Sequence, residues 1–102
     1  MIEVVGQYNT AVCYTGELEE AAAGQIKAVC DQSAFADCKI RIMPDVHAGK
    51  GCTIGTTMTI TDKVVPNMVG VDIGCGMYTV NLGKVDIDLE KFDEAAHSIP
   101  CG

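Results

Sequence analysis

The chain has 102 residues, of which 48% are hydrophobic and 21% are charged, and its formal net charge is −7. Together with a mean hydropathy of +0.21, this composition excludes an intrinsically disordered chain and fits a soluble globular piece of one domain at most. The acidic balance excludes nucleic-acid binding through a broad basic surface, because phosphate contacts need clustered Lys and Arg.

The periodicity of apolar residues predicts an α+β chain that mixes short strands and helices. Residues 2–5 and 10–14 are expected as short strands. Four apolar residues then recur at helical spacing, with Thr15 as the expected cap: Leu18, Ala22, Ile26 and Val29. A strand is expected over 39–43 and another over 54–60, with 49–51 as their connection.

The last third of the sequence alternates again before a final helix. Extended residues 69–71 lead to Asp72, and the alternation of apolar residues over 78–82 predicts a further strand. Asp88 is expected to begin a helix whose buried side consists of Leu89, Phe92, Ala95 and Ala96. His97 is expected to close that helix through its carbonyl groups rather than to bind metal.

The cysteines and the first residues favour a cytoplasmic protein. Six cysteines stand at irregular spacing, at positions 13, 30, 38, 52, 75 and 101, and no signal peptide or membrane span is visible. Reduced thiols are therefore expected. Five of them are interpreted as packing residues, and Cys75 alone lies in a glycine-rich loop.

Charge is unevenly distributed along the chain. Acidic residues gather over 17–20 and 86–94, where they fit solvated helix faces and helix amino termini. Between residues 39 and 63, by contrast, four basic residues stand against Asp45 and Asp62: Lys39, Arg41, Lys50 and Lys63. An RNA substrate would be expected to meet this locally positive segment.

The most informative stretch is 69–77, VGVDIGCGM, in which Asp72 and Cys75 sit three residues apart among glycines. Both side chains are possible ligands of first-row metals, and the glycines permit backbone angles that aim them at one point. The residues alone favour a purely structural interpretation, because free Cys is often buried and Asp is common in turns. No C-x-x-C pair, Walker A motif or dinucleotide fingerprint is present.

A second polar loop, 43–51, carries Asp45, His47 and Lys50. Asp45 either organises the turn or serves as a general base, and His47 is either its hydrogen-bonded partner or a donor that positions substrate. Lys50 either contacts a phosphate or is simply solvated.

Residues 43–55, MPDVHAGKGCTIG, followed by 65–77, VPNMVGVDIGCGM, resemble the amino-terminal signature of the RtcB family of RNA-splicing ligases. The resemblance extends more weakly to His97-Ser98-Ile99-Pro100. It implies that residues 1–102 are the amino-terminal part of an RtcB-like catalytic domain, truncated at the carboxyl end, within a larger α/β fold.

The resemblance also implies an activity. RtcB ligases join RNA ends that carry a 2′,3′-cyclic phosphate or 3′-phosphate to 5′-hydroxyl ends, using GTP and two Mn²⁺ ions, in tRNA splicing or RNA repair. Asp72 and Cys75 would be metal ligands, with the thiolate bridging two ions, and Asp45 and His47 would be catalytic. The substrates would be tRNA halves or broken RNA ends, with or without an activating partner such as archease.

The family's guanylylated histidine and its three metal-ligating histidines have no counterpart among the two histidines of this chain. The 102 residues by themselves are therefore expected to be inactive. Two alternatives remain: a metal-dependent phosphoesterase that uses the same carboxylate and thiolate, and a non-catalytic protein in which both loops are structural.

Overall fold

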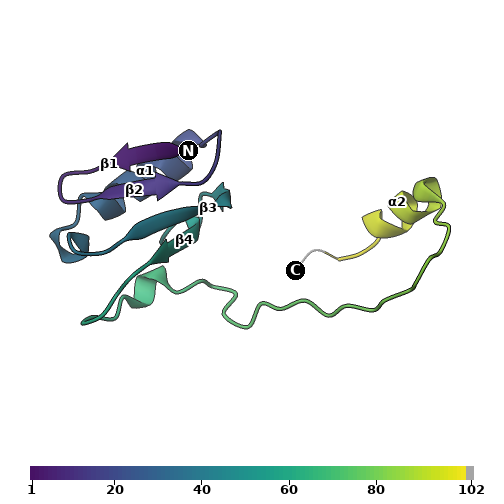
Figure 1. Ribbon diagram of the computed structural model, residues 1–102. Helices are drawn as coiled ribbons and strands as arrows, with labels where there is room; N and C mark the ends of the chain where they lie inside the picture. The colour runs from purple at the N-terminus through teal and green to yellow at the C-terminus, as the bar shows by residue number, and fades with distance from the viewer. Residues whose placement is uncertain (101–102) are drawn as a thin grey trace.

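The computed structural model describes residues 1–100 and shows an α+β arrangement built on a four-stranded mixed sheet (Figure 1). The strands are β1 (Ile2–Val5), β2 (Thr10–Cys13), β3 (Ile40–His47) and β4 (Ile54–Met58), in the order β1-β2-β3-β4. The β2–β3 pair is parallel, and its crossover contains helix α1 (Glu20–Cys30). The other two pairs are antiparallel.

The core lies between α1 and the sheet. Helix α1 contributes Ile26 and Cys30, and the short 3-10 helix η1 (Ser33–Phe35) contributes Phe35. The sheet and its connections contribute the remaining buried side chains, which are Ala11, Cys13, Cys38, Ile40 and Ile42. Three cysteines thus serve as packing residues, as expected, and burial raises the pKa of the Cys13 and Cys30 thiols. Cys101 lies outside the described residues.

The expected cap of the first helix is wrong. Helix α1 begins after Glu19, whose side chain makes no capping hydrogen bond. Thr15 instead forms a local turn, in which its hydroxyl donates to the Glu17 carbonyl (2.8 Å) and accepts from the Glu17 N–H (3.2 Å). A Thr side chain competes for nearby backbone groups in this way wherever the chain has not yet become helical.

Strand β3 is longer than the predicted strand over 39–43 and continues through Pro44 to His47. Proline cannot donate to a ladder, and the register between β3 and β4 shifts between Ile42 and His47. At this irregularity Gly55 has φ +85, and a Cβ atom there would lie 3.2 Å from Asp45 Oδ1. A glycine therefore gives the Asp45 carboxylate room above β4.

Beyond the 3-10 helix η2 (Pro66–Met68), the chain runs away from the sheet as an extended segment that ends in α2 (Leu89–His97) (Figure 1). The predicted strand over 78–82 is not formed. A strand needs a partner to satisfy its backbone groups, and no described strand lies beside this segment. The radius of gyration is 18.1 Å, against about 13 Å for a compact domain of this length.

Helix α2 begins as expected but its apolar side is not buried. The Asp88 carboxylate accepts the Lys91 N–H (3.2 Å), and His97 Nδ1 lies 2.8 Å from the Asp93 carbonyl at the last turn. Leu89 is 74% exposed and Phe92 is 61% exposed, so the prediction of a buried face is wrong. The reason is that α2 packs against no other element of the described chain. Within residues 1–100, no helix is long and apolar enough to span a membrane.

This separation yields a stability prediction. A chain ending at Gly70 should unfold with a free energy within about 0.5 kcal/mol of the whole chain, because removing exposed residues that pack on nothing changes little. Urea denaturation followed by circular dichroism measures this. A loss of several kcal/mol would show that residues 71–100 contribute to the fold of the sheet.

Candidate active site

The loop that follows η2 brings Asp72 and Cys75 together. The Cys75 N–H donates to the Asp72 carbonyl (3.1 Å), which closes a turn between the two residues. The Asp72 carboxylate also lies near enough to the Cys75 thiol to raise its pKa. Both residues are exposed. A carboxylate and a thiol are therefore brought to the same exposed turn.

The electrostatics of this pair favour a protonated thiol. The hydrogen bond from Cys75 to Asp72 raises the pKa of the thiol above its usual value, and the negative charge of the carboxylate raises it further. A metal ion that binds the sulfur must displace this proton, so binding would release it to solvent.

Asp45 and His47 lie in the last residues of β3, not in a free turn as expected. Both are exposed, and His47 Nδ1 lies 2.9 Å from the backbone carbonyl of Asp45. Because a carbonyl only accepts, Nδ1 must carry the hydrogen. In this tautomer Nε2 carries no hydrogen and can accept one.

The four predicted site residues do not form one cluster. Among residues 1–100, no three His, Cys, Asp or Glu side chains come close enough to hold a metal ion. The structure joins Asp72 to Cys75, and His47 to the backbone of Asp45, as two separate pairs.

The loop after β3 nevertheless touches the segment that leads to Asp72. Gly51 has φ +96 and approaches Asn67 so closely that a Cβ atom would lie 2.6 Å from the Asn67 carbonyl oxygen. Beside it, the Cys52 thiol lies 3.6 Å from the Met68 carbonyl, as a weak hydrogen bond. The two glycine-bearing loops of the sequence are therefore linked through 51–52 and 67–68.

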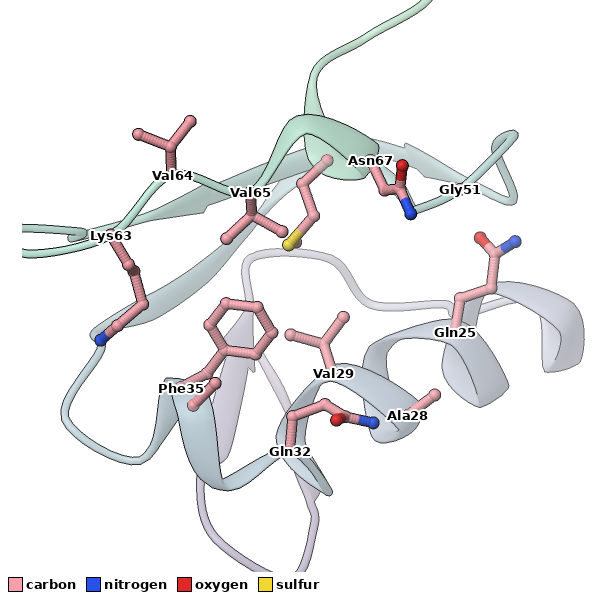
Figure 2. A pocket seen from close by; sticks show the side chains of 12 residues that line it. Gln25, Ala28, Val29, Gln32, Phe35, Gly51, Lys63, Val64, Val65 and Asn67 are labelled. Atoms are coloured by element: carbon pink, nitrogen blue, oxygen red, sulfur yellow. The ribbon is translucent and has the colours of Figure 1, made fainter.

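Gln25 fixes this loop from helix α1, a role that was not predicted from the sequence. Its Nε2 donates to the Gly49 carbonyl (2.8 Å), and its Oε1 accepts from the Gly49 N–H (3.1 Å) and the buried Thr53 hydroxyl (3.4 Å). Figure 2 shows Gln25 rising from the helix towards the strand-connecting loop at Gly51. In the sequence, Gln25 looks like any solvent-exposed polar residue of an amphipathic helix. Its role becomes visible only once the structure places it beside the loop.

A broad apolar cleft beside α1 does not contain the candidate residues. It measures about 600 Å³ and lies between α1, η1 and residues 63–68 (Figure 2). Its lining is mainly apolar, with Val29, Phe35, Val65 and Met68 among its walls. Asp45, His47, Asp72 and Cys75 are all absent from that lining.

Comparison with known proteins assigns the chain to a class, that of the RNA ligases of tRNA splicing. The family model described as tRNA-splicing ligase RtcB matches residues 25–100, which include Gln25 and both loops. The chain belongs to the RtcB family.

Individual relatives match over a shorter stretch. RNA-splicing ligase RtcB of Escherichia coli strain K12 is 48% identical over 52 residues, which cover 51% of this chain and 13% of that protein. RtcB1 of another Escherichia coli strain gives the same identity and shares, and RtcB2 of that strain is 41% identical over 51 residues. The chain thus matches only about an eighth of the length of these relatives. No solved structure matches it.

The Gln25 contacts give a testable change in stability. Gln25→Ala should lower the free energy of unfolding by about 1–2 kcal/mol, because it removes two bonds to Gly49 and leaves a buried hydroxyl without an acceptor. Urea denaturation measures the loss, and amide hydrogen exchange at Gly49 should quicken. Gln32→Ala is the matched control, since the Gln32 side chain hydrogen-bonds to no described residue. Equal effects of the two substitutions would contradict the role of Gln25.

The pKa of Cys75 gives a second prediction. Asp72→Asn should lower that pKa, because the carboxylate charge is lost and the amide oxygen that remains is a weaker acceptor. The thiolate fraction at about pH 8 then rises, and iodoacetamide should alkylate Cys75 faster. Peptide mapping by mass spectrometry assigns the modification to Cys75. Asp86→Asn is the control, because it removes an exposed carboxylate elsewhere and should leave the alkylation rate of Cys75 unchanged. An unchanged rate in Asp72→Asn would show that the side chains of Asp72 and Cys75 do not interact in solution.

Proposed function

We propose that residues 1–102 form the amino-terminal part of the catalytic domain of an RNA ligase. The whole protein would join RNA 2′,3′-cyclic phosphate or 3′-phosphate ends to 5′-hydroxyl ends, with GTP and Mn²⁺, in the cytoplasm. Its substrates would be tRNA halves or broken RNA ends, and archease would be a candidate activator. The observation that carries the proposal is the contact between Asp72 and Cys75 within the segment that matches the family.

The donor chemistry of this pair fits a divalent metal ion in part. Carboxylate oxygen suits Mn²⁺, whereas thiolate is a softer ligand that also suits Zn²⁺. Two side chains do not complete a coordination shell, so further ligands would come from outside residues 1–100. When bound, the metal would supply positive charge that neutralises a phosphate during transfer.

The chain's own residues would orient and deprotonate the incoming hydroxyl. The Nδ1 of His47 is engaged by the Asp45 carbonyl, which leaves Nε2 to accept the proton of a 5′-hydroxyl. The Asp45 carboxylate, held above Gly55, would orient that hydroxyl. This assignment exchanges the roles expected from sequence, in which Asp45 was the base and His47 a donor.

A chimera tests the proposal. Residues 25–100 of this chain would replace the matching part of the Escherichia coli ligase RtcB, and joining of a 3′-phosphate RNA to a 5′-hydroxyl RNA would be measured with GTP and Mn²⁺. We expect joining by the chimera. Asp72→Asn or Cys75→Ser within it should lower the rate at least about 100-fold, as losses of a catalytic group do. Zn²⁺ should compete with Mn²⁺, because the sulfur ligand favours it.

Asp86→Asn within the chimera is the matched control, and it should leave the rate unchanged. A chimera that folds and forms a labelled guanylate adduct but joins no RNA would contradict the ligase assignment. RNA hydrolysis without any adduct would favour a phosphoesterase instead. The isolated 102-residue chain is expected to join no RNA.

A further inference from the structure

We propose that a groove between residues 50–51 and 66–71 binds a phosphate group of the RNA, with Lys50 as its cationic contact. The inference rests on the proposed ligase function and adds a substrate-binding position to it. The groove has a volume of about 330 Å³. Its lining residues are Lys50, Gly51, Pro66, Asn67, Val69 and Val71.

The position of the groove connects it with the candidate metal ligands. One wall is the loop after β3, which begins directly after His47, and the other wall ends at Val71, next to Asp72. A phosphate in the groove would therefore lie between the loop that follows His47 and the segment that leads to Asp72.

The charges on the groove favour an anion. The Lys50 ammonium, like those of Lys39 and Lys84, forms no ion pair within residues 1–100, and among these three lysines only Lys50 lines the groove. The backbone N–H groups of Lys50, Gly51 and Cys52 also donate to no acceptor in that part of the chain. Successive free N–H groups in a turn beside a lysine are a common setting for phosphate oxygens.

The loop that carries these donors is held in place before any ligand binds. Gln25 ties its start at Gly49 and its end at Thr53 to helix α1, and Gly51 packs against Asn67. A preformed loop saves the ordering cost of binding. The apolar walls, Pro66, Val69 and Val71, suit the sugar and base of a nucleotide rather than a free inorganic ion.

Binding of a short fluorescein-labelled RNA with a 3′-phosphate to the 102-residue chain tests the inference by fluorescence anisotropy at low salt. Lys50→Ala should weaken binding about tenfold, as expected for the loss of one charge-assisted hydrogen bond. It should also reduce the slope of log Kd against log salt by about 0.7, the value for one phosphate contact on a single strand. Lys50→Arg should retain most of the affinity.

Lys39→Ala is the matched control, because Lys39 is an exposed lysine outside the groove and the substitution removes the same charge. Equal weakening by both alanine variants, or no RNA binding at low salt, would overturn the inference. Competition with GTP distinguishes an RNA phosphate from a GTP phosphate as the ligand of the groove. If GTP displaces the RNA at a concentration far below that at which inorganic phosphate displaces it, the groove binds GTP, and the proposed RNA contact is overturned.

The outcome is separable from that of the proposed function. A chimera that joins RNA equally well with and without the Lys50→Ala substitution, at RNA concentrations below saturation, would overturn the phosphate contact and leave the ligase assignment intact.

Discussion

The hydrogen bonds between Gln25 and the loop from Gly49 to Thr53 are the contact on which the rest of the site depends. They tie the loop to a helix whose other face is in the core, at Ala22, Ile26 and Cys30. The loop in turn places Gly51 and Cys52 against residues 67 and 68, which lie a few residues before Asp72 in the sequence. The Gln25 side chain and the contacts of Gly51 and Cys52 with residues 67 and 68 therefore fix the exposed loops relative to the buried core.

The two halves of the chain have different sources of order. Residues 1–68 contain every core residue of the described chain and all its strand pairs, whereas Val71, Ile73, Met77 and Tyr78 are each at least 78% exposed. Alternating apolar residues that bury nothing contribute no hydrophobic free energy to folding.

Sequence patterns correctly predicted the elements that depend on residues close together in the sequence. Strands 2–5 and 10–14, the first helix, the Asp88 cap and the His97 terminus depend on neighbours in sequence, and the structure contains each of them. The strand over 78–82 and the buried face of α2 required partners that the described chain does not provide, so these predictions were wrong. The role of Gln25 was not predicted, because its hydrogen-bond partner Gly49 lies 24 residues away in the sequence. Spacing and glycine content indicated that Asp72 and Cys75 would meet, since only a turn lies between them.

The Asp72–Cys75 contact has a consequence for how the site would acquire a metal. The Asp72 carboxylate raises the pKa of the Cys75 thiol, which keeps the proton on the sulfur. A metal ion that binds the sulfur must displace this proton and order a segment that packs against little, and both steps reduce the observed affinity. Two ligands offset these costs poorly, whereas additional ligands from a longer protein would bind the ion and order the loop together. Metal binding and completion of the fold around residues 69–76 are therefore expected to be coupled, so the same side chains that bind the metal would also fix the extended segment in place.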